Sequence, residues 1–268
     1  MKKIIPIVLA VGLILTVAVW GVSAAEPAGS RSARQDLPEI RLAAVETIGR
    51  GVPGAPSLPS ELIPMMEWTE GTALLAEAGD AAFYGQSDGS ALLRWGDVLA
   101  EFDWLYATPR AIAPRLWLAD ADGDGAEELL VRCYGGSGTG VSLEFLYVVE
   151  KTAGGLVSRE FPVQVLRDTL REPLEVVTSD GAVYAALGRE LVDITAEMPR
   201  DTLPRAIRLG IGQIAEYIRT EAGLTGSFAV RMEVGPQALP GPYVAEVQAC
   251  ICYQEDGSFV VSDLHLLS

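Results

Sequence analysis

Short apolar runs separated by turn signals fill the chain between residues 80 and 150. Ser87-Asp88-Gly89 and Trp95-Gly96-Asp97 have the composition of turns that join neighbouring strands. Apolar and polar residues then alternate from Val141 to Val149, the period of a strand with one buried face. The pattern predicts a meander of strands over Ala81–Gln86, Ala91–Arg94, Val98–Trp104, Arg115–Ala119, Glu128–Tyr134 and 141–149.

Helical patterns are expected mainly after residue 151, with weaker ones near the start of the chain. Val163, Leu166 and Leu170 share one face of a short helix that follows Pro162. A short helix around 37–47 and a helical turn over 72–78 are further expectations.

A longer helix is predicted from Leu203 to Ala222. Isoleucines recur there at intervals of four, three and four residues, at Ile207, Ile211, Ile214 and Ile218. Pro204 suits the first turn of this helix and Gly223 suits its end. Gly210 and Gly212 each weaken it by about 1 kcal/mol relative to alanine, so it needs packing to persist.

The end of the chain returns to strand patterns over Ser227–Val234, Val244–Gln254 and Phe259–Leu267. Asp256-Gly257 between the last two predicts a hairpin. Its register would place Cys250 opposite Asp263 and Gln248 opposite His265. The elements together predict an α+β protein, with an antiparallel β-rich N-terminal half and a mixed helix and hairpin C-terminal half.

The pattern divides the chain into four regions. Residues 1–25 have a basic start, an apolar run and small residues at the end, as in a signal peptide or a retained membrane anchor. Residues 26–60 are rich in Pro, Gly and Ser and predict a flexible linker. A β-rich region over 61–155 and an α+β region over 156–268 follow, and the sequence leaves open whether they form one domain. The leader predicts a secreted or otherwise extracytoplasmic protein.

Charge excludes some classes of partner. The chain carries 20 basic and 36 acidic residues, a formal net charge of −16. Such a surface repels nucleic acids and anionic lipids, so membrane contact is expected only through the N-terminal segment. Three cysteines are an odd number for an exported protein and exclude a disulfide scaffold.

The most specific chemistry lies in the acidic sequence from Asp120 to Glu128. Carboxylates stand at the first, third and fifth positions, Asp120, Asp122 and Asp124, and can converge if the chain turns sharply. Gly125 at the sixth position allows that turn.

A backbone carbonyl at Ala126 and the carboxylate of Glu128 can complete a cage of oxygen ligands. Such a ligand set, without His or Cys, suits calcium better than magnesium or zinc. The flanks are strand-like and position twelve is Val131, so the sequence is not an EF-hand. The alternative is a solvated acidic turn between two strands.

Asp120, Asp122, Asp124 and Glu128, with Leu129 opening the next strand, resemble the calcium loops of FG-GAP and VCBS-type repeats. The resemblance implies calcium as the bound ion. Those families stack several units into a propeller, whereas this sequence contains one unit. The stretch from Phe102 to Val141 also resembles uncharacterised exported proteins of Gram-positive bacteria, a resemblance that implies no activity.

A second candidate site lies on the terminal hairpin, where Cys250, Cys252, Asp263 and His265 would share one face. Two sulfurs, an imidazole and a carboxylate suit zinc, but thiols spaced Cys-x-Cys on a strand lie wider apart than a tetrahedral site prefers. The alternative is a set of small residues beneath a covering helix. The sequence leaves this choice open.

Catalytic patterns are weak. A single histidine without a matching Ser or Cys motif gives no hydrolytic triad. Glu101 and Asp103 form the nearest carboxylate pair, on what the pattern predicts as a solvated strand face. The sequence thus favours a non-enzymatic, calcium-stabilised binding or structural module with a protein or glycan partner outside the cytoplasm. The alternative is a secreted hydrolase of cell-wall polymer or glycan that uses carboxylates as acid and base.

Overall fold

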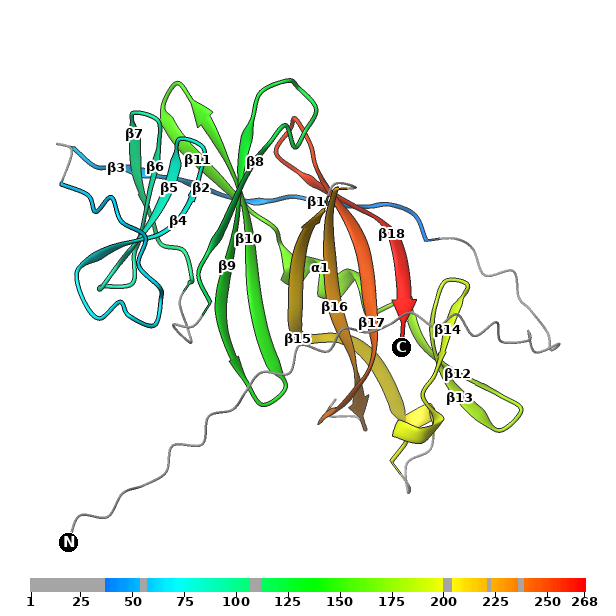
Figure 1. Ribbon diagram of the computed structural model, residues 1–268. Coiled ribbons are helices and arrows are strands. Elements are labelled where there is room, and N and C mark those ends of the chain that lie inside the picture. Colours follow the sequence, from blue (N-terminus) through cyan, green and yellow to red (C-terminus); the bar gives the residue numbers. More distant parts are fainter. Residues whose placement is uncertain (1–36, 54–56, 107–111, 200–203, 221–222, 236–238) are drawn as a thin grey trace, which may run out of the picture. The chain divides into compact units, whose positions relative to one another are not determined.

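The computed structural model describes residues 37–53, 57–106, 112–199, 204–220, 223–235 and 239–268. These residues form eighteen β-strands, one α-helix and two short 3₁₀ helices (Figure 1). The strands belong to three hydrogen-bonded sheets. The protein is β-rich in both halves, so the prediction of an α+β fold with a mixed helical C-terminal half is wrong.

A five-stranded antiparallel sheet contains most of the predicted meander. Its order is β3-β7-β6-β5-β4, with β3 at Arg50–Gly51, β4 at Thr72–Ala78, β5 at Ala81–Gln86, β6 at Ala91–Trp95 and β7 at Val98–Phe102. The helical turn predicted over 72–78 is wrong. Leu74 and Leu75 pack into different apolar clusters. Because β4 is buried on both sides, it lacks the alternation that marks a half-exposed strand.

The largest sheet has ten strands and combines both halves of the chain. Eight strands follow the order β1-β18-β17-β16-β15-β10-β11-β2, and β9 and β8 extend from β10. Their bounds are β1 Ile40–Leu42, β2 Val45–Ile48, β8 Arg115–Ala119, β9 Glu128–Gly138, β10 Val141–Thr152, β11 Gly155–Glu160, β15 Ile207–Thr220, β16 Gly223–Val234, β17 Leu239–Tyr253 and β18 Phe259–Leu267. Residues 61–155 and 156–268 both contribute to this sheet, and they belong to one compact unit, Ala33–Ser268.

A small sheet and the helix complete the fold. The sheet has the order β12-β13-β14, with β12 at Leu174–Ser179, β13 at Ala182–Leu187 and β14 at Glu190–Asp193. The helix α1 spans Val163–Leu170, which confirms the prediction made for this segment; the 3₁₀ helices are η1, Thr195–Glu197, and η2, Pro204–Ala206. Among the helices of the described chain, none is long and apolar enough to cross a membrane. The predicted leader lies outside the described residues.

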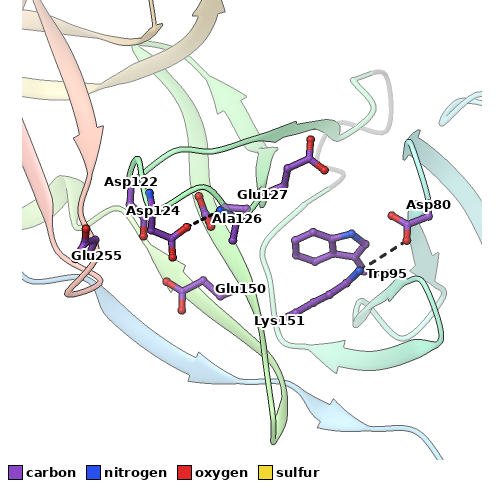
Figure 2. Close-up of a pocket in the computed structure, with 10 residues that line it drawn as sticks. Asp80, Trp95, Asp122, Asp124, Ala126, Glu127, Glu150, Lys151 and Glu255 are labelled. Carbon is purple, nitrogen blue, oxygen red and sulfur yellow. Dashed lines mark hydrogen bonds and ion pairs between the residues drawn. The ribbon is translucent and has the colours of Figure 1, made fainter.

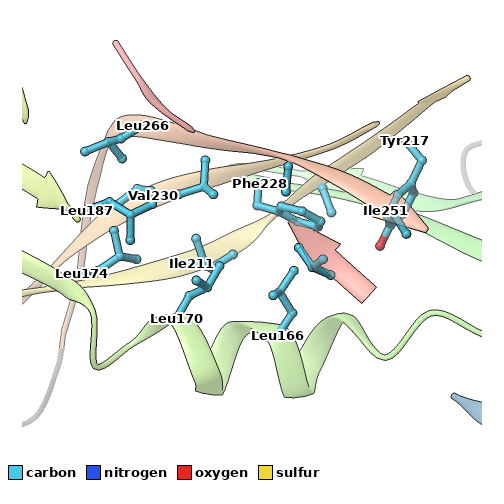
Figure 3. Close-up of a cluster of buried hydrophobic side chains, with 14 of the residues drawn as sticks. Leu166, Leu170, Leu174, Leu187, Ile211, Tyr217, Phe228, Val230, Ile251 and Leu266 are labelled. Atoms are coloured by element: carbon cyan, nitrogen blue, oxygen red, sulfur yellow. The ribbon is translucent and has the colours of Figure 1, made fainter. Parts of the chain in front are cut away.

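The strands β9 and β10 separate two apolar clusters. Leu130 and Val148 belong to the larger cluster, which also contains the buried side of α1. Leu129 and Val149 belong to the second cluster, shared with the five-stranded sheet. In the larger cluster the leucines of α1 point toward side chains of β15–β17 (Figure 3). Burial on both faces explains the unbroken apolar run Leu129–Val131 in β9.

The segment Ile40–Gly51 contains β1, β2 and β3, and we call it the N-terminal strap. Its strands pair with β18, β11 and β7 respectively. β1 and β2 stand at the two ends of the eight-strand order, and the strap connects these ends through the chain itself. The flexible linker predicted over 26–60 is therefore wrong for the strap, and so is the short helix over 37–47. Residues 26–36 and 54–56 of the predicted linker lie outside the described residues.

Arg159 of β11 connects the strap to the terminal hairpin. Its guanidinium binds Glu46 of the strap at 2.9 Å, Glu150 of β10 at 2.6 Å and the hydroxyl of Tyr253 at 3.0 Å. A Cβ atom on Gly257, in the hairpin turn, would lie 2.3 Å from Nε of Arg159. Glycine is required there by this approach and by a φ of 76°.

A second charged contact links β9, β10 and β15 where β10 and β15 are not paired. Arg132 and Glu144 are both buried, with 3.6 Å between their charged groups. Arg132 donates to the backbone carbonyl of Tyr217 at 3.0 Å, and Glu144 accepts from the Tyr217 amide at 2.9 Å. The two side chains thus satisfy backbone groups that β10 leaves unpaired, and we call them the Arg132–Glu144 clasp.

The predicted long helix over 203–222 is wrong, because this segment contains strand β15. Ile207 and Ile211 are buried, whereas Ile218 is 45% exposed, so the isoleucines do not share one face. The pairing with β16 skips between Ile211 and Ala215, so the strand contains a bulge. A spacing of four residues, as between Ile207 and Ile211, fits one face of a strand as well as one face of a helix, so the isoleucines imitate a helical period.

Gly212 lies in this bulge and provides a test of the strand. A Cβ atom there would lie 2.3 Å from the ring of Tyr243, whose hydroxyl bonds to the Gln213 amide and the Gly140 carbonyl. We expect Gly212→Ala to lower the free energy of unfolding by about 1 to 3 kcal/mol through overpacking, measured by urea denaturation. In a helix the same change would stabilise the protein by about 1 kcal/mol. A higher free energy of unfolding for Gly212→Ala than for the unchanged protein would contradict the assignment of this segment as a strand.

Candidate functional site

The acidic loop joins β8 to β9 as the turn of a hairpin. The pairing runs from Arg115 with Arg132 to Ala119 with Glu128, so the loop closes directly above a strand pair. Gly123 and Gly125 have φ values of 83° and 91°, the left-handed conformation that glycine adopts without strain. The predicted acidic bend between two strands is confirmed, including the sharp turn at the sixth position.

The three aspartates of the loop converge. Asp120, Asp122 and Asp124 each place one carboxylate oxygen within 4.8 Å of the other two. The backbone holds them there, since Asp120 accepts from the amides of Gly123 at 2.8 Å and Gly125 at 3.2 Å. Asp122 accepts from the amide of Asp124 at 3.1 Å. The geometry is that of a cluster that can hold a metal ion.

The side chain of Asp124 accepts from the amide of Ala126 at 2.7 Å, which orients the residue predicted to offer its carbonyl. Glu128 lies apart from the three aspartates as the first residue of β9. It is buried, at 4% exposure, and accepts from the amide of Ala121 at 2.7 Å. The structure therefore brings together the aspartates but keeps Glu128 at the base of the loop.

Burial raises the pKa of Glu128 above its ordinary value, and the negative charges of Asp122 and Asp124 raise it further. The bond from the Ala121 amide opposes this rise. The folded protein therefore favours the ionised form of Glu128 less than the unfolded chain does. A bound cation would reverse this by its own charge.

We expect Glu128→Gln to stabilise the protein at neutral pH when a chelator is present. Because the pKa of Glu128 is higher in the folded protein than in the unfolded chain, this residue stabilises the fold most when it is protonated. That stabilisation is lost as the pH rises through the pKa of the folded state. Glutamine has no charge, and its amide oxygen can still accept from Ala121. Thermal melts in chelator at neutral pH and near pH 4 should show the advantage of the variant shrinking at low pH. An advantage that is independent of pH would contradict the role of the charge.

A depression of about 480 Å³ adjoins the loop (Figure 2). Asp122 and Asp124 line it from the loop, Glu150 from β10 and Glu255 from the terminal hairpin. On its far side Lys151 lies 4.3 Å from the ring centre of Trp95 and 3.7 Å from Asp80. Sequence reasoning missed these acidic neighbours, because they come from separate strands and no local pattern connects them.

The terminal hairpin is confirmed, but its register is right only in part. Gln248 faces His265 as predicted, whereas Cys250 faces Ser262 rather than Asp263. Asp263 has a φ of 50° and lies at the register shift.

The four hairpin residues therefore do not form a metal site. His265 lies 2.8 Å from Glu190 of β14. Cys252 is exposed and Cys250 is half-buried, so the helices of the described residues leave both side chains accessible. Among the described residues, the Asp120–Asp124 cluster meets the geometric requirement for a metal and this set does not.

Glu101 and Asp103 lie at the surface, where both bind Arg50, at 2.8 and 3.0 Å. The side chain of Asp103 is 81% exposed. Trp104 is buried and stacks on Phe102, with 4.4 Å between ring centres. The predicted solvated face is confirmed, and neither carboxylate lines the depression beside the acidic loop.

Comparison with known proteins finds no family model, no curated protein and no solved structure that matches the chain.

Proposed function

We propose that the protein is an exported, non-enzymatic binding or structural module whose sheet is stabilised by calcium at the acidic loop. The observation that carries the proposal is the convergence of Asp120, Asp122 and Asp124 within 4.8 Å, on a hairpin turn preshaped by two left-handed glycines. Export is inferred from the sequence of residues 1–25.

The donor set fits a hard cation. Asp120, Asp122 and Asp124 supply carboxylate oxygens, the carbonyl of Ala126 supplies a neutral oxygen, and Glu128 can act through a water molecule. Calcium accepts six to eight oxygen ligands with flexible geometry, whereas magnesium demands a stricter octahedron. The exposed position of the loop suits the affinity range of extracellular calcium modules, about 10⁻⁴ to 10⁻³ M.

A cation bound at the acidic loop would stabilise the fold. The loop joins β8 to β9, and β9 separates the two apolar clusters. A bound ion would neutralise the repulsion among the aspartates and hold the ends of both strands together. The partner class we propose is a protein or glycan outside the cytoplasm.

Isothermal titration calorimetry on the mature chain tests the proposal. We expect calcium to bind with a dissociation constant of about 1 mM or tighter, and Asp122→Asn to weaken binding at least tenfold. Asp97→Asn is the matched control, because Asp97 is an exposed aspartate in another strand turn. Absence of calcium binding, or equal loss in both variants, would overturn the proposal.

A further inference from the structure

A groove of about 570 Å³ lies on a different part of the protein, between β12 and β15. Leu174, Val176 and Thr178 line it from β12, and Ile207, Arg208 and Leu209 line it from β15. Leu174 and Leu209 are buried members of the main apolar cluster (Figure 3 labels Leu174). The groove thus has an apolar floor that belongs to the core and remains in place without a ligand.

Each strand beside the groove has a backbone partner on one side only. β12 stands at the end of its three-stranded sheet and pairs with β13 alone. The first part of β15, Ile207–Ile211, pairs with β16. Its pairing with β10 begins only at Gln213. Among the described strands, none occupies the second edge of either stretch, so backbone donors and acceptors are available there.

The groove is lined by two arginines, and one of them is already paired with a carboxylate. Arg171 lines one end and is held at 2.9 Å by the buried carboxylate of Glu233. Arg208 is exposed on the β15 wall and makes no ion pair within the described part of the chain. Glu175 lies on the opposite wall, along β12. The combination selects a ligand with a carboxylate on the side of Arg208 and apolar groups over the floor.

We propose that this groove binds an extended peptide of another protein, which adds as a strand to an open edge and places a carboxylate against Arg208. Main-chain hydrogen bonds would supply affinity, and alternate apolar side chains would pack over Val176 and Ile207. An extended peptide fits better than a rounded ligand, since the walls are two strands and the floor is apolar along their length. The proposal stands apart from the calcium site and does not depend on it.

A defined peptide pool tests the proposal. N-acetylated hexapeptides with Val, Ile or Leu at alternate positions, Asp, Glu, Ser or Thr between them and a free C-terminus are passed over the immobilised mature chain. Retained peptides are resynthesised and titrated by calorimetry. We expect dissociation constants of about 1 mM or tighter. Methylation of alternate backbone amides should weaken binding more than tenfold, because a methylated amide cannot pair with a strand edge.

The matched variants are Arg208→Glu and Arg94→Glu, both changes of exposed arginines on strands. Arg208→Glu should weaken peptide binding at least tenfold, whereas Arg94→Glu should not change it, with melting curves confirming that both variants fold. No retained peptide, or equal binding of the methylated peptide, would overturn the proposal. So would self-association of the chain that Arg208→Glu abolishes, because the occupant would then be a second copy.

Discussion

Arg132→Leu is expected to lower the free energy of unfolding by about 3 to 5 kcal/mol, measured by urea denaturation at neutral pH. The substitution leaves Glu144 as a buried carboxylate without its guanidinium, and it removes the donor to the carbonyl of Tyr217. Loss of one partner from a buried ion pair costs more than the pair contributes, because the remaining charge stays desolvated.

The effect of Arg132→Leu should shrink as the pH falls from neutrality toward about 5. Burial already raises the pKa of Glu144, and Arg132 opposes that rise. Without the arginine the pKa rises further, so protonation at low pH removes the cost of the unpaired charge. Arg50→Leu is the control, since its ion pairs are exposed and should contribute about 0 to 1 kcal/mol. Equal losses in both variants would contradict a special role for the clasp.

Calcium is expected to raise the melting temperature by about 3 to 10 °C at about 10 mM, measured by differential scanning calorimetry against a chelated sample. A dissociation constant of about 10⁻⁴ to 10⁻³ M gives about 1.4 to 2.7 kcal/mol of stabilisation at that concentration. A chain of this length gains about 2 to 4 °C per kcal/mol.

Asp122→Asn should abolish most of this shift, because it removes one of three convergent carboxylates, and Asp97→Asn should preserve it. Magnesium at the same concentration should act more weakly. If neither calcium nor chelator changed the melting temperature, the proposal of a calcium site would be contradicted, and the loop would be a solvated acidic turn.

Prediction from sequence succeeded where the signal is local. β5 and β8 have the bounds that alternation and turn residues indicate, and the hairpin at Asp256-Gly257 follows from two residues. The shape of the acidic loop could be predicted for the same reason, because its carboxylates, its turn and its flanking strands lie within one hairpin.

Prediction failed where burial removes or imitates a period. β4 is buried on both sides, so its continuous apolar run looked helical, and the four-residue spacing of isoleucines in β15 fits a strand face as well as a helix face. Gly210 and Gly212 were the available signal, since two glycines disfavour a helix and here permit close approach of Glu233 and Tyr243. The depression beside the loop could not be predicted, because Asp80, Glu150 and Glu255 meet only through long-range pairing.

The strap has a consequence for the order of events during biogenesis. β1 hydrogen-bonds to β18, so β1 cannot pair until the much later strand β18 has been synthesised. Such distant pairing slows folding. A chain that has not yet reached β18 therefore lacks the partner of β1, and Arg159 can contact the strap and the terminal hairpin together only once both segments have been synthesised.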